Sequence, residues 1–373
     1  MLNVCDKQQF TQITESLDEI ICYGAGQQLE EFVELFDGTN VLEKCIYVAD
    51  RDKSKQGTIK IIGKKQFLII SPEKMKVEHN ISCAIVITCA RYMEIIEFFE
   101  NDDILNKLDF YCLFYFKLFE KEKEIQKKVL PKCFKIYNEP IIPKVIHYCW
   151  FGENPIPDHY KRWMESWNRF CPDYEIKEWN ETNYDISKNK YMLQAYESKK
   201  WGFVPDYARL DIIYEHGGVY LDTDIELVAN IDDFLYQKGF ICFESETRIN
   251  CGMGFGAIKG LEIIWKMRED YDKRVFRKEN GELDLTPSPD LQTAFLEKNG
   301  LNRNGEYQNV KGLTVFPQKI MGGKNLFTRK IEVFPYTRAI HHFDGSWLEA
   351  NQRINVTRIE NGILLAQNKI LNR

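Results

Sequence analysis

Short apolar runs that read as strands alternate with helix-like segments through the first third of this chain. The strand-like runs lie at 19–23, 45–50, 83–88 and 109–116. Strands that alternate with helices pair in parallel, because each crossover helix returns the chain to the same edge of the sheet. Residues 1–130 are therefore predicted to form a small Rossmann-like α/β domain.

A glycine turn follows the first of these strands. Gly24 and Gly26 lie in the turn, and Asp50 closes the second strand. Such a turn can hold a phosphate at the start of the next helix. Leu29 stands where the dinucleotide fingerprint has its third glycine. Two interpretations stay open: a nucleotide-binding domain, or a degenerate Rossmann-like scaffold with a tight strand-to-helix turn.

A charged segment separates this region from the rest of the chain. Residues 117–130 favour a helix, and Pro131, Pro140 and Pro143 follow closely. A polar segment with clustered prolines is typical of a domain boundary, and a chain of 373 residues is long for one core. Strand-like and helix-like patterns are mixed again beyond the boundary, which predicts a second α/β domain over 140–373.

The bulk composition narrows the classes of partner and location. The net charge of -6 argues against a nucleic-acid partner, because phosphate-binding surfaces usually carry a basic excess. The N-terminal residues lack the basic and apolar regions of a signal peptide, and no apolar run reaches the length of a membrane span. We therefore expect a cytoplasmic protein without a transmembrane segment, whose contact with a membrane, if it makes one, is peripheral and at the inner face.

An acidic pair, Asp222 and Asp224, follows a short apolar run in the second domain. Residues 219–222 read as a buried strand that delivers both carboxylates to the loop beyond its carboxyl end, where open α/β sheets bind ligands. Two hard oxygen donors suit Mg²⁺ or Mn²⁺. Acids at strand ends are common, so the pair alone does not specify a function.

The segment before this strand adds a second acid and a cation. Asp206 and Arg209 are three residues apart on a predicted helix, 205–216, and therefore share one face. The helix is predicted to stop at Gly217 and Gly218, which suit a left-handed C-terminal residue. One interpretation is a surface ion pair; the other is a cleft that these two side chains share with the acidic pair.

The block 203–235, which contains all four residues, resembles the catalytic core of glycosyltransferase family 32 and its relatives with a D-x-D sugar-binding region. Further matching positions are the run 142–152 with Trp150, then Ser166, Trp167, the run 172–179, Ala339, His341, His342, Ser346 and Trp347. The resemblance covers about 140–350 and leaves the N-terminal domain outside. It implies a GT-A-like fold for the second domain.

The resemblance also implies roles for the acids and the arginine. Asp222 and Asp224 would bind the metal and, through it, the diphosphate of the donor. His342 would be a further metal ligand, since a neutral imidazole is an acceptable ligand for Mn²⁺, with a buried, hydrogen-bonded histidine as the alternative reading. Asp206 and Arg209 would hold the hydroxyls of the donor sugar. These two residues and the acidic pair are the implied catalytic residues.

Other matching positions are implied to bind the donor. Trp150 would stack on the nucleobase, with a core aromatic as the alternative reading. Ser346 and Trp347, together with His341 or His342, belong to a C-terminal loop that would complete the metal and diphosphate site. The candidate hydrogen-bond donors to the leaving diphosphate are Lys324, Arg329 and Arg338, with solvated surface charges as the alternative reading.

The implied activity is that of a metal-dependent, retaining glycosyltransferase. Its donor would be a UDP-sugar or GDP-mannose, and its acceptor a glycan or lipid-linked glycan of a surface or capsular polysaccharide. Two rival functions are a toxin-like transferase that glycosylates proteins and a non-catalytic protein that binds sugar nucleotides. The chain departs from many relatives at 287–290, which reads PSPD in place of T-G-P, and in the loop 244–254. Both departures concern the acceptor.

Overall fold

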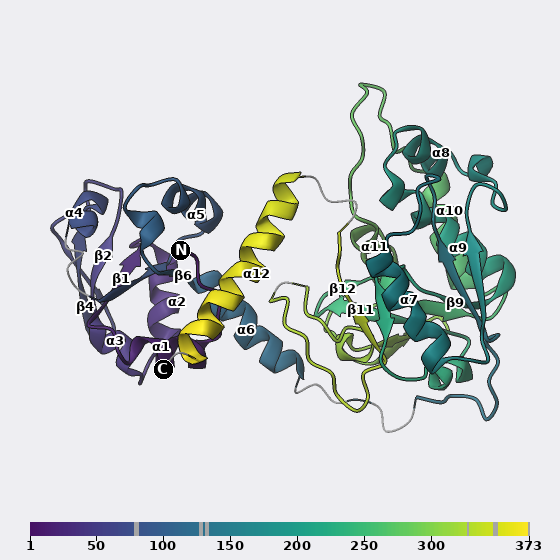
Figure 1. Cartoon of the computed structure of the whole chain (residues 1–373), viewed down its shortest axis with the longest axis horizontal. Helices are drawn as coiled ribbons and strands as arrows, with labels where there is room; N and C mark the ends of the chain where they lie inside the picture. Colours follow the sequence, from purple (N-terminus) through teal and green to yellow (C-terminus); the bar gives the residue numbers. More distant parts are fainter. Residues whose placement is uncertain (78–81, 127–129, 131–133, 327, 346–349, 372–373) are drawn as a thin grey trace. The chain divides into compact units, whose positions relative to one another are not determined.

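The computed structural model, drawn in Figure 1, describes residues 1–77, 82–126, 130, 134–326, 328–345 and 350–371. The chain divides into two compact units. The first contains Met1–Glu124 and Glu349–Arg373, and the second contains Ile125–Leu348. Each unit has its own sheet.

The first unit contains a six-stranded sheet in the order β3-β4-β2-β1-β5-β6. Its strands are β1 (Glu19–Tyr23), β2 (Cys45–Ala49), β3 (Ile59–Ile62), β4 (Lys65–Ile70), β5 (Cys83–Ile87) and β6 (Phe110–Cys112). The strands from β4 to β6 in this order are parallel, and the edge strand β3 is antiparallel. This is the parallel sheet that the alternating pattern predicts.

Helices cover both faces of this sheet. They are α1 (Lys7–Thr14), α2 (Gln27–Leu35), α3 (Asn40–Lys44), α4 (Pro72–Val77), α5 (Tyr92–Glu100), α6 (Leu113–Gln126), a short 3₁₀ helix (Leu105–Lys107) and α12 (Ala350–Leu371). Alternate residues of β1 point to opposite faces: Ile20 packs in one core with Phe32 of α2, and Ile21 packs in the other with Phe99 of α5. The predicted Rossmann-like α/β class is confirmed.

Groups of the protein itself, from Thr88 and Asp50, occupy the space around the glycine turn after β1. Gly24 has φ +113°, and a Cβ there would lie 2.8 Å from the carbonyl oxygen of Thr88. The amide of Ala25 donates to Oδ2 of Asp50 at 2.8 Å. The turn thus fits a tight strand-to-helix connection in which Asp50 takes up one amide at the start of α2.

One predicted strand, 109–116, is wrong beyond its first half. β6 ends at Cys112, and α6 begins at Leu113. Tyr115 and Phe116 lie on α6 and pack into the two cores on opposite faces of the sheet. An unbroken apolar run does not distinguish a buried strand from a buried helix, because both present apolar residues to a core.

The last helix, α12, packs on the first unit. The amide of Val4 donates to the carbonyl of Gly362 at 3.0 Å, and Nη2 of Arg358 lies 2.8 Å from Glu100. Ala366 is buried in the core beside α2. The sequence seam predicted one domain over 140–373, whereas the structure places the final helix with the first unit, where it buries its apolar stripe.

The second unit contains a larger, mixed sheet. Its strands are β7 (Val145–Cys149), β8 (Glu175–Trp179), β9 (Gly218–Tyr220), β11 (Gly239–Ser245), β12 (Arg248–Ile249), β13 (Phe255–Ala257), β14 (Gln308–Val310) and β15 (Leu313–Phe316). The order is β14-β15-β11-β13-β9-β7-β8, with β12 paired to β11. β13 is antiparallel to both of its neighbours, β9 and β11. Consequently β7, β8, β9, β11 and β15 all run the same way, and their carboxyl ends meet at one edge.

A two-stranded antiparallel ribbon lies outside this sheet. It pairs β10 (Ile225–Leu227), which follows the acidic pair, with β16 (Ala339–His341) near the end of the unit. Trp167 is fully buried and donates from Nε1 to the carbonyl of Ile225 at 2.8 Å. Because β16 pairs with β10, the C-terminal loop that follows β16 lies near the carboxyl end of β9.

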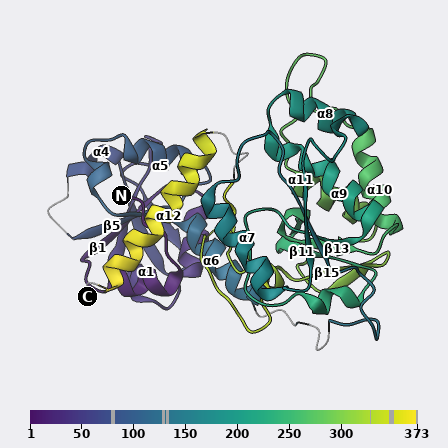
Figure 2. The same ribbon diagram turned by 45° about the vertical axis from the view of Figure 1, so that its right-hand side comes forward.

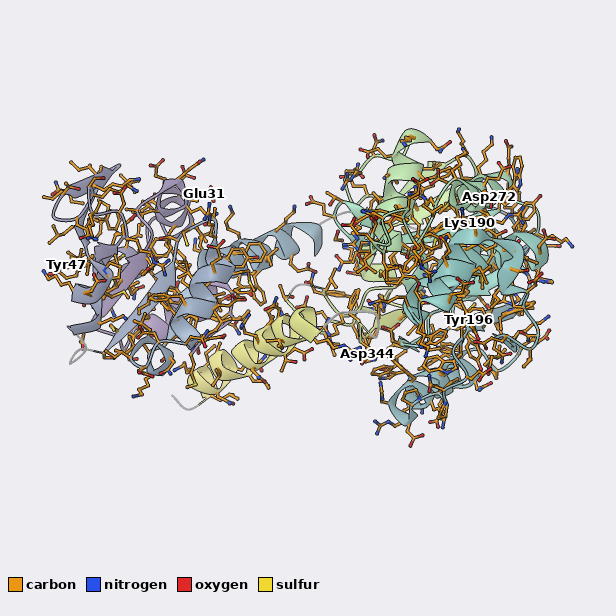
Figure 3. All side chains as sticks on the ribbon, turned by 90° about the horizontal axis from the view of Figure 1, so that it is seen from above. Glu31, Tyr47, Lys190, Tyr196, Asp272 and Asp344 are labelled. Atoms are coloured by element: carbon orange, nitrogen blue, oxygen red, sulfur yellow. The ribbon has the colours of Figure 1, made fainter. Side chains whose placement is uncertain are left out.

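The helices of the second unit are α7 (Asp158–Phe170), α8 (Lys190–Glu197), α9 (Pro205–His216), α10 (Glu262–Asp272) and α11 (Ser288–Lys298), with 3₁₀ turns at Ile186–Lys188, Trp201–Phe203, Asp232–Tyr236, Cys251–Met253 and Gln318–Ile320. α9 packs beside α10 (Figure 2). Asp272 accepts from Asn189 at 2.9 Å and joins the end of α10 to the start of α8, close to Lys190 (Figure 3). The predicted α/β class of the second domain is confirmed. Within the described ranges, no helix has the length and apolar character of a membrane span.

Candidate active site

The acidic pair lies in a tight turn between β9 and β10. The amide of Ile225 donates to the carbonyl of Asp222 at 3.1 Å, which closes the turn. Leu221 is fully buried and anchors the end of β9. The side chain of Asp222 is 29% exposed and that of Asp224 is 15% exposed, so the Asp222 carboxylate is the more accessible of the two.

Asp206, Arg209 and Asp222 come together at this edge of the sheet. Pro205 opens α9, and the one-turn spacing places Nη2 of Arg209 3.0 Å from Oδ1 of Asp206. Nη1 of the same guanidinium lies 3.6 Å from Oδ2 of Asp222. The hydroxyl of Tyr220 donates to Oδ1 of Asp222 at 3.0 Å. The surface ion-pair reading is wrong, because the side chains of Asp206 and Arg209 are only 3% and 4% exposed.

Burial sets the electrostatics of this group. It raises the pKa of Asp206 to about 7, although Arg209 and a hydrogen bond with Ser288 act in the opposite direction. Burial also opposes the charge on Arg209, but the carboxylates of Asp222 and Asp206 help to hold its pKa well above the usual value. Burial therefore favours the protonated form of Asp206, and the adjacent guanidinium favours its ionised form.

Asp224 faces the C-terminal loop. Its Oδ2 lies 3.4 Å from Nε2 of His341 and accepts from the amide of Asp344 at 3.1 Å. Burial would raise the pKa of Asp224, but the charge of His341 and these contacts hold it below the usual value. Burial likewise lowers the pKa of His341, but the Asp224 carboxylate outweighs that effect and raises it. Asp344, labelled in Figure 3, also accepts a hydrogen bond from the Tyr160 hydroxyl.

His342 has different partners. Its Nε2 is hydrogen-bonded to Oε2 of Glu226 at 2.8 Å, and its ring stacks on Trp163 with centroids 4.0 Å apart. Its amide donates to the carbonyl of Asp224 at 3.0 Å. The structure thus brings the side chain of His341 to the acidic pair, while His342 fastens the loop to β10 and α7.

The other predicted positions are distributed around the site. Trp150 follows β7 at the same sheet edge, is half-buried, and donates from Nε1 to the carbonyl of Asn154 at 2.6 Å. Lys324 and Arg329 each donate to the carbonyl of His342 at 3.2 Å, and Arg338 lies 3.3 Å from Asp233. Lys324 and Arg329 therefore support the C-terminal loop. Ser346 and Trp347 lie outside the described residues.

Sequence reasoning missed a buried acid at the end of β11. Glu244 is 3% exposed and lies at the same edge as Asp222, since β9 and β11 run in the same direction. Asn250 and Gly252, in the loop after β12, connect it to the acidic pair. An apolar strand that ends in an acid was the available signal, and it is the same signal that identified Asp222.

The acidic pair has the donor chemistry of a divalent-cation site. The part of the chain that the structure describes holds no group of three or more His, Cys, Asp and Glu side chains placed to bind a metal. Two carboxylates are nevertheless sufficient protein ligands for Mg²⁺-like ions, which keep several waters and bind substrate phosphates. Asp222 and Asp224 therefore fit a cation that shares its coordination with a diphosphate.

These features define an α/β domain with a buried acid–arginine pair and a D-x-D turn at the carboxyl edge of its sheet. Residues 157–241 match the family model described as "Glycosyltransferase sugar-binding region containing DXD motif". The matched segment contains Asp206, Arg209, Asp222 and Asp224. The predicted family resemblance is confirmed.

Curated relatives and a solved structure match parts of the chain. Inositol phosphoceramide mannosyltransferase 3 of Schizosaccharomyces pombe is 30% identical over 141 residues, which are 35% of this chain and 39% of that protein. Mannosyl phosphorylinositol ceramide synthase of Saccharomyces cerevisiae is 31% identical over 105 residues, which are 27% of each chain. The solved PaToxG glycosyltransferase has a TM-score of 0.35 and 16% identity over 48% of this chain and 75% of its own. The chain thus spans well under half the length of these two curated relatives.

Proposed function

We propose that this protein is a glycosyltransferase that moves a sugar from a nucleotide-sugar donor to a glycan, with a divalent cation, Mn²⁺ or Mg²⁺, at the acidic pair. The observation that carries the proposal is the buried Asp206–Arg209 pair, 3.0 Å between nitrogen and oxygen, with Arg209 also 3.6 Å from Asp222. A buried guanidinium between two acids is costly unless its charge is matched. In a donor site, these charges would form hydrogen bonds with the hydroxyls of the sugar and attract the negative diphosphate.

The residues divide into two groups by what they would bind. Asp222 and Asp224 would hold the cation and, with it, the donor diphosphate. Asp206 and Arg209 would hold sugar hydroxyls, because they combine an acceptor with a fixed donor fork. His342 would reach the cation, as the family resemblance implies, only through Nδ1 or after leaving Glu226.

The nucleoside end of the donor would lie beyond the diphosphate. Trp150 follows β7 at the same edge as the acidic pair, and its ring would stack on the nucleobase. Ser346 and Trp347 would contact the diphosphate from the C-terminal loop.

The chemical problem is to break the bond between the anomeric carbon and a diphosphate oxygen. When bound, the cation would supply Lewis-acid charge to the leaving diphosphate. Arg209 keeps a fixed positive charge near the reacting sugar, and Tyr220 and Arg209 orient the Asp222 carboxylate. Asp206 is held by Arg209 at 3.0 Å. We propose that the acceptor hydroxyl attacks from the face that the diphosphate leaves and passes its proton to the departing diphosphate oxygen. The sugar would keep its anomeric configuration.

The names of the relatives suggest where to look for the substrates. The two curated relatives reported above are named for mannose transfer to inositol phosphoceramide and for synthesis of a mannosylated ceramide. GDP-mannose is therefore the first donor to test, ahead of UDP-sugars. We propose a glycan or lipid-linked glycan as acceptor, in surface or capsular polysaccharide synthesis, at the cytoplasmic side of a membrane. Intact-mass analysis of co-expressed proteins tests the toxin-like alternative, in which a protein would gain a hexose.

A thermal-shift panel tests the site. GDP-mannose and UDP-sugars are added with Mn²⁺ to the wild type and to Asp224→Asn. A ligand at 100 times its Kd stabilises the folded state by about 2.7 kcal/mol, which raises the melting temperature by several degrees. We expect one donor to raise it in the wild type but not in Asp224→Asn. Asp158→Asn is the matched control, because that side chain is 92% exposed.

Two outcomes would count against the proposal. If no sugar nucleotide shifts the wild type, the chain has no donor site. If Asp224→Asn shifts as much as the wild type, the donor does not bind at the acidic pair. A non-catalytic sensor would show the shift without any release of nucleoside diphosphate.

A further inference from the structure

A second acid, Glu244, ends a strand at the edge that carries the acidic pair. Its side chain is 4% exposed. Burying a carboxylate costs free energy unless its oxygens have partners. The partners of Glu244 therefore indicate its structural role. Nε of Arg248 lies 3.1 Å from Oε2 and balances part of the charge. Oε1 accepts from Nδ2 of Asn250 at 2.7 Å.

This contact orients the amide of Asn250. A carboxylate can only accept hydrogen bonds, so the NH₂ end of Asn250 turns to Glu244 and its oxygen faces the other way. That oxygen accepts from the amide of Gly252 at 2.6 Å. Glu244 thus determines, through Asn250, which atom is offered to the backbone of Gly252.

Gly252 in turn lies directly against Asp222. Its carbonyl accepts from the amide of Asp222 at 3.1 Å. A Cβ on Gly252 would be 2.1 Å from Oδ2 of Asp222, so the glycine backbone forms the wall on which this carboxylate rests. The same carboxylate also contacts Tyr220, whose hydroxyl donates to Oδ1, and Arg209, whose Nη1 lies 3.6 Å from Oδ2.

Helix α11 holds the same loop from its other side. Oγ1 of Thr293 accepts from the amide of Ile249 at 2.9 Å, and Oε1 of Gln292 accepts from the amide of Cys251 at 2.9 Å. The amides of Ile249, Cys251 and Gly252 therefore all donate to buried side chains. Asn250 supplies the bond nearest to Asp222.

We propose that Glu244 and Asn250 are positioning residues that fix the carboxylate of Asp222 through the backbone of Gly252. They keep that carboxylate against Tyr220 and Arg209, in the place where a cation and a donor diphosphate would meet it. The inference rests on the proposed function and adds to it the residues that set the geometry of the acidic pair.

The test measures binding of Mn²⁺ with UDP, and of Mn²⁺ with GDP, by titration calorimetry. Asn250→Asp removes the donor to Glu244 and sets two carboxylates against each other. We expect its affinity to fall by about 10- to 100-fold, as is typical when a partner of a metal ligand is lost. The double variant Glu244→Gln, Asn250→Asp reverses the hydrogen bond, since the amide introduced at position 244 can donate to the carboxylate introduced at position 250. It should return the affinity to within about three-fold of the wild type. Asn302→Asp makes the same change at an exposed position and serves as the control.

The outcomes separate this inference from the proposed function. Wild type that binds neither nucleotide with Mn²⁺ removes the proposed function and the inference together. Wild-type affinity in Asn250→Asp overturns the inference alone. A double variant as weak as Asn250→Asp shows that the charge of Glu244 acts directly and not through Asn250. If Asn250→Asp does not fold, Asn250→Ala carries the same expected loss of affinity, and unchanged binding in that variant overturns the inference.

Discussion

Replacing Gly252 with alanine tests whether the position of the Asp222 carboxylate matters. The new Cβ would lie 2.1 Å from Oδ2 of Asp222 and 3.0 Å from Oδ1 of Asn250, whereas ordinary contacts begin at 3.4 Å. The carboxylate must therefore move by more than an ångström. Gly252 has no left-handed backbone strain to confuse the result, because its φ lies outside the positive range.

The displaced carboxylate would lose its present contacts, which are 3.0 Å to the Tyr220 hydroxyl and 3.6 Å to the Arg209 guanidinium. A hydrogen bond to a charged group contributes about 1.5–3 kcal/mol, which corresponds to a loss of roughly 10- to 150-fold in donor affinity. We expect Gly252→Ala to fold, with a Kd for its donor raised by about that factor.

The assay is donor binding by titration calorimetry, with melting temperature measured on the same samples. Gly281→Ala is the control: its Cβ meets nothing within 4 Å, although φ there is +86°. It is expected to cost stability of about 1 kcal/mol and to leave donor affinity unchanged. A folded Gly252→Ala protein whose donor affinity is within about two-fold of wild type would show that the position of the Asp222 carboxylate does not set donor affinity.

The remaining predictions concern pH and the C-terminal loop. Burial raises the pKa of Asp206 from 3.8 to about 7, so the folded state binds this proton more tightly than the unfolded state. The protonated carboxyl therefore stabilises the folded state fully below pH 3.8, and this contribution is lost as the pH rises to 7. Chemical denaturation at several pH values should therefore show Asp206→Asn losing less stability than wild type across that window, and parallel curves would contradict the assigned burial effect. His342→Gln should change Mn²⁺ affinity by less than about three-fold, because Nε2 is already bound to Glu226; a loss as large as that of Asp224→Asn would make His342 a metal ligand.

Local pattern predicted the fold class and the centre of the candidate site. The helix α9 was predicted with its observed bounds, and the strand predicted over 219–222 is observed as β9, Gly218–Tyr220, two residues short of Asp222. Both were recognisable because apolar spacing and a glycine stop are properties of adjacent residues. The placement of α12 was not predictable in this way. Its partners, such as Val4 and Glu100, are more than 250 residues away in sequence, and amphipathic spacing does not say which core a helix covers.

Long-range pairing also explains what was missed within the site. Glu244 reaches the acidic pair because β11 runs in the same direction as β9 with β13 between them, which one sequence does not reveal. The choice between His341 and His342 follows from the pairing of β16 with β10. In that register His341 is opposite Ile225, next to Asp224, whereas the adjacent-residue pattern leaves both histidines equivalent.

Release of nucleoside diphosphate from a sugar nucleotide tests the proposed glycosyltransferase activity most directly, and NMR of the product then gives its anomeric configuration. Wild-type protein with Mn²⁺ should release nucleoside diphosphate from GDP-mannose or one UDP-sugar and keep the configuration of the donor, and Asp224→Ala should not release it. No release from any donor, full release by Asp224→Ala, or an inverted product would contradict a retaining, metal-dependent transferase with its cation at the acidic pair.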